Sequence, residues 1–428
     1  MIEISSYLLA IIQFIIITIV CYYEYKRKSI AIFLWAMLLL LFGSMHLLTV
    51  FSEVHKYSMW VYDEASVFVI LFSICYLFVR CLQKKKSIII DFENKNINLL
   101  NRQHRYIKIT FFIFLLCVGY KMYSLVTYAG SLLDSSWYSM RELASSKGYI
   151  SEDQIITCLY YYSASSFLLF MYCGKKKMAI LTALLVVLVA LISRNRIEIL
   201  PLLVSIIAYY VFKSQGLTIR KLLLFLLLAI VIVILIYALQ IFRYYGSVYE
   251  FIVNFDLSYF FEQIITNMSE GEGDMSLRDH FYYFIYKNND FENFNEGHTY
   301  LRMLLVFVPT SWSMGLKPPD FAISMGTAVM PAWQGYSVHP TLFGDCYANF
   351  GFWGFLLGAF WAIYVNIIDK LATKEDVNYK IGVIVLNANA LIIMGRGSVY
   401  NSFVLALYGM ILMWLIYKLN NLLVGKNK

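Results

Sequence analysis

Residues 177–213 read KMAILTALLVVLVALISRNRIEILPLLVSIIAYYVFK, which is two apolar runs separated by Ser193-Arg194-Asn195-Arg196. A single helix over the whole stretch would be about 55 Å long, whereas the hydrocarbon core of a membrane is about 30 Å thick. The sequence therefore predicts two consecutive membrane-spanning helices joined by a tight turn that carries two arginines.

The rest of the chain follows the same pattern. Of its 428 residues, 60% are hydrophobic and 14% are charged, against about 25% charged residues in ordinary soluble domains. This composition excludes a soluble enzyme, a disordered protein and a nucleic-acid-binding module. The predicted fold is an all-α, polytopic transmembrane helix bundle of about eleven spans. The spans are expected at 4–23, 30–52, 62–82, 106–127, 154–173, 177–193, 196–213, 219–242, 346–368, 378–395 and 399–418.

The basic residues orient these spans. With the N-terminus outside, every inner loop carries at least three lysines or arginines, and most of the 35 in the chain lie on the inner side, as cytoplasmic segments require. The net charge of +8 then reflects the lysines and arginines of the inner loops and does not indicate a basic binding patch. An odd number of spans places the C-terminus in the cytoplasm.

Three parts follow from this layout. Residues 1–242 form an N-terminal bundle of about eight spans, and residues 346–428 form a C-terminal bundle of about three. Residues 243–345 form a large outward-facing loop. Its short apolar piece, 300–309, is expected to be an interfacial or re-entrant helix. Because long loops without a function are uncommon, this loop is the expected site of chemistry or binding.

Four arginines stand at outer span ends, where positive charge contributes nothing to orientation. They are Arg194, Arg196, Arg243 and Arg396. Their planar guanidinium groups suit phosphate oxygens, so together they are expected to bind a diphosphate at the membrane surface. The alternative is that they anchor helix ends at the lipid head groups. Arg194 could also pair with Glu198, four residues along a helix.

His339 is the preferred candidate for a general base, because it lies in the outer loop just before a span. A neutral imidazole can take a proton from a sugar hydroxyl near pH 7. A structural or solvated histidine is the alternative. His46 lies inside a span and is expected to pack in the core. No nucleotide-binding loop, zinc-protease motif or serine-hydrolase motif is present, and neither a metal nor a cofactor is expected.

Several stretches resemble one family of membrane enzymes. Ser193-Arg194-Asn195-Arg196 before an apolar span resembles that family's arginine turn. Tyr300-Leu301-Arg302, leading through Val308-Pro309 to Lys317-Pro318, resembles the segment before its re-entrant piece. Residues 340–354, PTLFGDCYANFGFWG, resemble its entry into the next span. With the layout of spans and outer loop, these stretches are similar to the Wzy-type O-antigen polymerases.

The resemblance implies a GT-C-like glycosyltransferase in the bacterial inner membrane with its active site facing the periplasm. Such enzymes join oligosaccharide repeat units carried on undecaprenyl diphosphate, without a nucleotide sugar or metal. The acceptor hydroxyl displaces undecaprenyl diphosphate from the donor glycan. The expected partners are this lipid-linked oligosaccharide and membrane lipid, with a polysaccharide chain-length regulator as a further candidate and no nucleic acid.

On this interpretation His339 is the catalytic base, and Asp345 is its reserve. The arginines supply positive charge where the diphosphate leaves. The expected substrate-binding residues are Arg302, Lys317, Tyr300, Asp345 and Tyr347. Two alternatives stay open: an O-antigen ligase or other GT-C transferase, which would share these residues, and a lipid-linked oligosaccharide flippase or other transporter. Transporters usually carry midplane charges and inverted repeats, which the sequence lacks.

Overall fold

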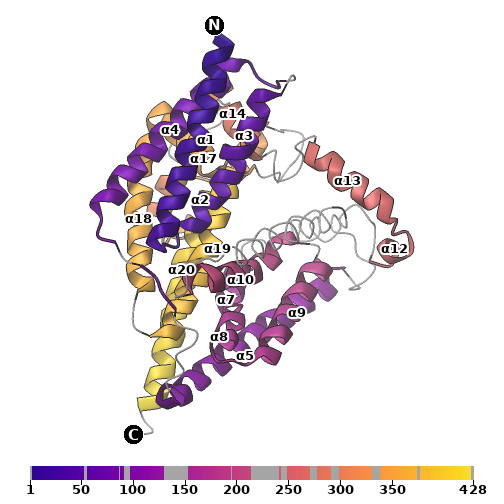
Figure 1. Ribbon diagram of the computed structural model, residues 1–428. Helices are drawn as coiled ribbons and strands as arrows, with labels where there is room; N and C mark the ends of the chain where they lie inside the picture. The colour runs from indigo at the N-terminus through magenta and orange to yellow at the C-terminus, as the bar shows by residue number, and fades with distance from the viewer. Residues whose placement is uncertain are drawn as a thin grey trace. The chain divides into compact units, whose positions relative to one another are not determined.

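A computed structural model gives the fold of this chain. It describes residues 2–52, 55–85, 87–90, 97–129, 153–193, 195–213, 241, 248–269, 277–290, 298–329, 338–373 and 376–425. These residues form helices and no strand, apart from one isolated bridge between Ile90 and Lys213 (Figure 1).

The first half of the described chain contains α1 (Ile2–Arg27), α2 (Ile32–Leu38), the π-helix η1 (Leu39–Ser44), α3 (Met45–Phe51), α4 (Met59–Leu82), α5 (Ile97–Ala129), α7 (Asp153–Ser163), α8 (Ser166–Tyr172), α9 (Lys176–Ser193), the 3-10 helix η3 (Arg196–Ile199) and α10 (Leu200–Phe212). The second half contains α12 (Val248–Val253), α13 (Leu257–Ser269), α14 (Leu277–Tyr286), α15 (His298–Leu304), η6 (Thr310–Trp312), α16 (Phe321–Val329), α17 (Thr341–Phe350), η7 (Gly351–Leu356), α18 (Leu357–Ala372), α19 (Val377–Arg396) and α20 (Val399–Gly425).

The chain is a multi-pass helical membrane protein. Within the ranges given above, nine helical segments are long and apolar enough to cross a membrane, and each overlaps one of the apolar runs predicted as spans. A tenth run forms a shorter apolar helix over Ile197–Phe212. The eleventh, 219–242, falls almost wholly outside the described residues, so the span count stays a prediction.

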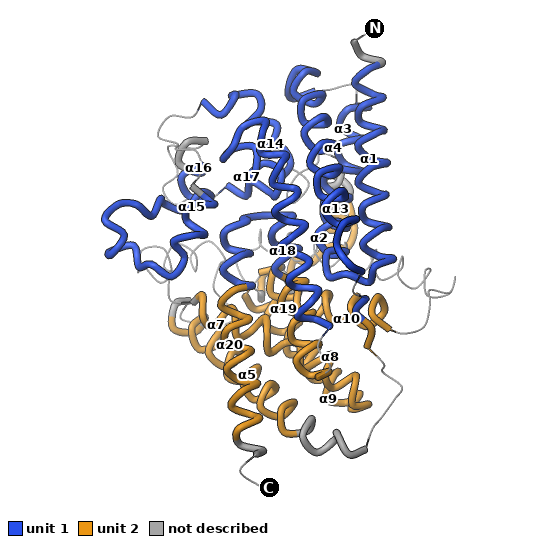
Figure 2. The backbone as a smooth tube through the Cα atoms, turned by 90° about the vertical axis from the view of Figure 1, so that its left-hand side faces the viewer, with its two compact units in different colours: residues 1–88, 271–373, 390–406 blue, residues 89–270, 374–389, 407–428 orange. Residues whose placement is uncertain are grey.

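The chain divides into two compact units (Figure 2). Unit 1 comprises residues 1–88, 271–373 and 390–406, and unit 2 comprises residues 89–270, 374–389 and 407–428. Both α19 and α20 contribute residues to each unit. The two units are described separately below.

Helices α1, α4 and α18 form the centre of unit 1, with α4 packed against both of the others (Figure 1). The approach of α18 to α4 is close at Gly358, where a Cβ atom would stand 2.4 Å from the carbonyl oxygen of Phe72. Only glycine fits without moving one of the two backbones. Small residues at such crossings let membrane helices gain dispersion contacts along their length.

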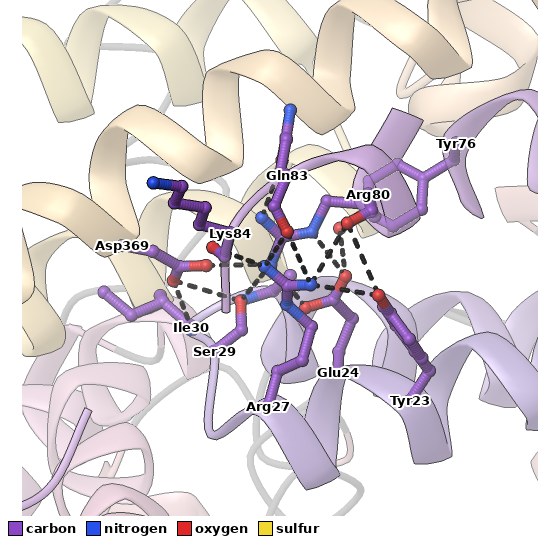
Figure 3. Close-up of polar contacts among 11 residues, drawn as sticks. Tyr23, Glu24, Arg27, Ser29, Ile30, Tyr76, Arg80, Gln83, Lys84 and Asp369 are labelled. Atoms are coloured by element: carbon purple, nitrogen blue, oxygen red, sulfur yellow. Dashed lines mark hydrogen bonds and ion pairs between the residues drawn. The ribbon is translucent and has the colours of Figure 1, made fainter. Parts of the chain in front are cut away.

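A buried ion cluster ties the C-terminal ends of these three helices together (Figure 3). The Arg80 guanidinium of α4 donates to Glu24 of α1, with Nε–Oε1 2.7 Å and Nη2–Oε2 2.6 Å, and to Asp369 Oδ2 of α18 at 2.8 Å. The Arg80 and Glu24 side chains are fully buried and that of Asp369 is 3% exposed. Because α1, α4 and α18 end at one place, they run parallel to one another.

The remaining oxygens of this cluster also have partners. Tyr76 Oη donates to Glu24 Oε1 at 3.0 Å, and Ser29 Oγ donates to Asp369 Oδ1 at 3.0 Å. Arg27 closes the end of α4, because its guanidinium donates to the carbonyls of Arg80, Gln83 and Lys84 over 3.1–3.4 Å. A helix end otherwise leaves such carbonyls without partners. The cluster is therefore almost fully hydrogen-bonded, as buried charges require.

The segment expected as one continuous span over 346–368 is built differently. Helix α17 ends at Phe350, the chain turns at Gly351 with φ of +58°, and η7 precedes α18. At Gly354 a Cβ atom would stand 2.2 Å from the carbonyl oxygen of Cys346, so η7 packs directly on α17. The reversal depends on tertiary contacts, which hydropathy does not report.

Unit 2 contains α5, α7, α8, α9 and α10. Helix α7 packs against α5, and α8 packs against both α5 and α9. Tyr162 of α7 and Tyr106 of α5 are buried, and their hydroxyl oxygens are 2.5 Å apart. The predicted turn between 177–193 and 196–213 is confirmed, because α9 ends at Ser193 and η3 begins at Arg196.

Candidate functional site

His339 is held in place by the backbone on either side of it. The Val338 N–H donates to the carbonyl of Ala322 in α16 at 2.9 Å, and the Thr341 N–H donates to the carbonyl of Gly397 at 2.9 Å. The half-buried imidazole lies against Gly397, where a Cβ atom would stand 3.7 Å from Nδ1. This arrangement brings His339 next to Arg396 in unit 1.

Arg396 is the last residue of α19, and α20 begins at Val399. Arg396 therefore lies at the junction of these two helices, and its binding of a diphosphate stays a prediction. The Gly397 N–H donates to the carbonyl of Ile393 at 2.7 Å, which closes the helix end. Ser398 Oγ accepts from the Asn401 N–H at 3.2 Å and caps α20. The chain thus turns sharply at Arg396 and Gly397, and the Arg396 side chain is half-buried there.

Arg302 and Lys317 form a second group of positive charge in unit 1. Arg302 Nη1 donates to the Pro318 carbonyl at 2.5 Å, and its guanidinium lies 4.7 Å from the ring centroid of Tyr400 in α20. Lys317 Nζ donates to the Val308 carbonyl at 2.7 Å. Burial lowers the pKa of Lys317, and the nearby Arg302 lowers it further.

The partners of these two cations in the described part of the chain are uncharged. The ion pairs found there involve Lys56, Arg80 and Lys121, and neither Arg302 nor Lys317. Arg302 Nε is buried and finds no hydrogen-bond acceptor among the described residues. The positive charges of Arg302 and Lys317 repel one another, and a bound anion would relieve that repulsion. The Arg302 Nε–H could donate a hydrogen bond to such an anion.

Asp345 is 1% exposed on α17 and its carboxylate is engaged by neighbouring residues. Thr299 Oγ1 donates to Asp345 Oδ2 at 2.8 Å, and Asn349 Nδ2 lies 3.3 Å from Oδ1. Asn349 Oδ1 also accepts from the Thr299 N–H at 3.0 Å. These contacts join α15 to α17. The structure therefore brings Asp345 into the packing between α15 and α17, and its contact with substrate stays a prediction.

The two predicted tyrosines also lie in unit 1. Tyr300 Oη is 3.1 Å from Cys346 Sγ and accepts from Trp361 Nε1 at 3.4 Å. Burial raises the pKa of the Tyr300 hydroxyl well above its ordinary value, with smaller contributions from Cys346. Tyr347 is 2% exposed, and its hydroxyl donates to Glu64 Oε1 at 2.6 Å. Both residues support α17, and a role in holding sugar stays a prediction.

The other predicted arginines belong to unit 2. Arg194 and Arg243 lie outside the described residues. Arg196 is described through its backbone as the first residue of η3. Glu198, the alternative partner of Arg194, forms an ion pair with Lys121 of α5 at 2.6 Å. The sequence did not suggest this pair, because the two residues are 77 positions apart.

Two further features were missed by sequence reasoning. The sequence does not indicate that Tyr400 is the aromatic partner of Arg302, or that Arg80 is buried in an ion cluster. One signal could have indicated the burial of Arg80. It lies in the last turn of an apolar span, and an acidic residue, Glu24, lies at the same end of another apolar helix. His46 matches its expected packing role, because it is buried with Tyr282 Oη 2.6 Å from Nδ1 and Ser66 Oγ 2.8 Å from Nε2.

Among the described residues no group of three or more His, Cys, Asp or Glu side chains is arranged to hold a metal ion. No protein-family model, curated protein or solved structure matches the chain. The family resemblance therefore stays a prediction from the residues, and the site is judged by its own geometry.

Proposed function

We propose that this chain is a GT-C-like membrane glycosyltransferase that polymerises oligosaccharide repeat units carried on undecaprenyl diphosphate, at the periplasmic face of the bacterial inner membrane. The observation that carries the proposal is the position of the His339 imidazole against Gly397, next to Arg396. The imidazole thus lies at the junction between α19 and α20, where Arg396 is the last residue of α19, and these two residue types are a proton acceptor and a phosphate-binding group.

The reaction assigns a step to each group. The acceptor sugar hydroxyl forms a bond to the anomeric carbon of the donor, and His339 takes the hydroxyl proton. The bond between that carbon and the bridging phosphate oxygen breaks, and its electron pair leaves on undecaprenyl diphosphate. A positively charged group must stabilise the negative charge that develops on this leaving group. Arg396, the residue before Gly397, is proposed for this purpose.

Arg302 and Lys317 support the same proposal. Arg302 lies over Tyr400, which is in the first turn of α20, the helix that follows Arg396. Its buried Nε and the neighbouring lysine favour an anionic ligand, for the reasons given above. Arg194, Arg196 and Arg243 are proposed as additional diphosphate ligands on the sequence pattern alone.

Complementation of a deletion strain tests this function. His339→Gln and Arg302→Gln are expected to remove long-chain polymer while leaving a single repeat unit on the lipopolysaccharide core, as seen on a gel. His55→Gln is a matched control, because His55 packs against Tyr62, with tilted rings and centroids 5.7 Å apart, and lies outside the proposed site. Immunoblots of membranes confirm equal protein amounts.

The pattern of surviving glycan separates the alternatives. Loss of all O-antigen, including the single unit, would assign the chain as a ligase. Accumulation of repeat units on the inner leaflet would assign it as a flippase. Wild-type chain lengths in both site variants would reject the proposed site.

A further inference from the structure

Between α15 and α16 of unit 1, the chain forms a closed hairpin over residues 308–317 (Figure 2). Lys317 Nζ donates to the Val308 carbonyl at 2.7 Å and joins the two ends of the hairpin. At the tip, η6 leads into a turn in which the Leu316 N–H donates to the Ser313 carbonyl at 2.8 Å. Hydrogen bonds made within the hairpin therefore hold its shape.

The side chains on the outside of this hairpin are large and apolar. Trp312 is 76% exposed, Met314 is 94% exposed and Leu316 is 71% exposed. Leu304, at the end of α15, is 82% exposed. Ser313 lies between these residues in the sequence and is buried. The polar side chain thus points inward and the apolar ones point outward, which is the reverse of the arrangement that water favours.

The backbone at the tip of the hairpin is also strained. Met314 has a φ of +49° and Gly315 has a φ of +81°. Glycine adopts this left-handed conformation readily, whereas the Cβ atom of a methionine crowds the backbone there. A strained residue persists where its surroundings compensate for the strain. Because Met314 is almost fully exposed, we expect something outside the chain to cover it.

Positive charge borders this apolar surface. Lys317 closes the base of the hairpin, and Arg302 Nη1 donates to the carbonyl of the next residue, Pro318, at 2.5 Å. Residues 300–319 contain these two cations and no aspartate or glutamate. Lysine and arginine side chains at the edge of a bilayer extend to the lipid head groups, and tryptophan is enriched at the same depth. The apolar tip and its cationic base therefore match the acyl chains and the phosphates of a lipid leaflet.

A protein partner fits this surface less well. A stable protein interface uses about 20–30 residues on each side, which is more than one short hairpin offers. The chain is itself a multi-pass membrane protein, so a bilayer is already present to cover the hairpin.

We propose that the 308–317 hairpin inserts its tip into the outer lipid leaflet and anchors this part of the outer loop to the membrane. Trp312, Met314 and Leu316 enter the region of the acyl chains, and Arg302 and Lys317 stay at the depth of the lipid phosphates. This contact differs from the interfacial helix expected over 300–309, because the tip of the hairpin lies beyond that stretch. The inference uses the predicted topology and does not depend on glycan transfer.

Tryptophan fluorescence of the purified full-length protein in phospholipid nanodiscs tests the insertion. Subtracting the spectrum of Trp312→Phe from that of the wild type isolates the emission of Trp312 from that of the other tryptophans. Phospholipids that carry bromine on their acyl chains quench a tryptophan that lies among those chains. They are expected to remove at least about half of the Trp312 emission, whereas iodide in the water is expected to remove less than about a fifth.

Replacing Met314 and Leu316 together with glutamate places two charges at the tip, and is measured with and without Trp312→Phe. A charged side chain lowers the inserted population of a segment by about a hundredfold, so quenching of Trp312 by the brominated lipid is expected to disappear and quenching by iodide to rise. Met314→Leu keeps the tip apolar and is expected to keep the lipid quenching.

Leu257→Glu is the matched control, because it adds the same charge at an exposed leucine of α13. It is expected to leave the quenching of Trp312 unchanged. Strong quenching of wild-type Trp312 by iodide would place the hairpin in water, and quenching by neither agent would place it against protein. Either result would overturn the insertion, as would an equal loss of lipid quenching in Leu257→Glu. None of these measurements requires glycan transfer, so the insertion and the proposed function fail separately.

Discussion

Replacing Arg80 with methionine removes the cation that forms ion pairs with both Glu24 and Asp369 in the buried cluster (Figure 3). The change deletes two hydrogen bonds to Glu24 and one to Asp369, all of 2.8 Å or less. It also leaves two carboxylates facing one another away from water. Removing one partner of a buried ion pair costs about 3–5 kcal/mol, so Arg80→Met is expected to lower the free energy of unfolding by at least about 3 kcal/mol.

Unfolding in increasing sodium dodecyl sulphate, followed by tryptophan fluorescence, measures this loss. Lys85→Met is the control, because Lys85 is exposed just beyond the same helix end and its loss is expected to cost less than about 0.5 kcal/mol. Adding Glu24→Gln to Arg80→Met removes one of the stranded charges and is expected to recover part of the stability. The reasoning fails if Arg80→Met and Lys85→Met behave alike, or if the second substitution makes the protein still less stable.

Three further predictions concern other parts of the fold. Gly358→Ala forces a Cβ onto the α4 backbone and is expected to destabilise by about 1–3 kcal/mol in the same unfolding assay, whereas Gly119→Ala, which meets nothing within 4 Å, is expected to be neutral or stabilising. Burial lowers the pKa of His280 below its ordinary value of 6.5. Just below pH 6.5, His280 therefore binds a proton in the unfolded chain but not in the folded chain. Stability should then fall as the pH drops through 6.5, and His280→Asn should flatten an unfolding series between pH 7.5 and 5. Tyr400→Ala removes the ring beneath Arg302 and is expected to shorten polymer chains, while Tyr400→Phe keeps the ring and the chain-length distribution on a gel.

The spans and the arginine turn could be predicted because each depends on a local property. An apolar run of about 20 residues has one stable arrangement in a membrane, and α9 and η3 meet within a residue or two of the expected break. Arg396 could be placed between two spans on the same reasoning. Hydropathy also showed that no long span lies in the stretch around 300–309, where α15 is seven residues long.

The contacts that build the candidate site could not be predicted, because they join residues far apart in the sequence. The position of His339 against Gly397 depends on two backbone hydrogen bonds, one to Ala322 of α16 and one to Gly397 beyond the end of α19. Arg302 finds Tyr400 only after α15 and α20 are packed. The break at η7 depends on the close approach of Gly354 to Cys346. None of these three contacts produces a periodic or compositional pattern in the sequence.

The ion cluster of α1, α4 and α18 has a consequence for how the protein is made. Glu24 and Arg80 are 56 residues apart, whereas Asp369 follows Arg80 by 289 residues. At about 5–20 residues per second, Asp369 is synthesised roughly 15–60 s after Arg80. Glu24 and Arg80 can therefore enter the bilayer together as a neutral pair, long before the second carboxylate exists. The carboxylate of α18 then gains its ion pair when α18 docks beside α4, and this favours that docking.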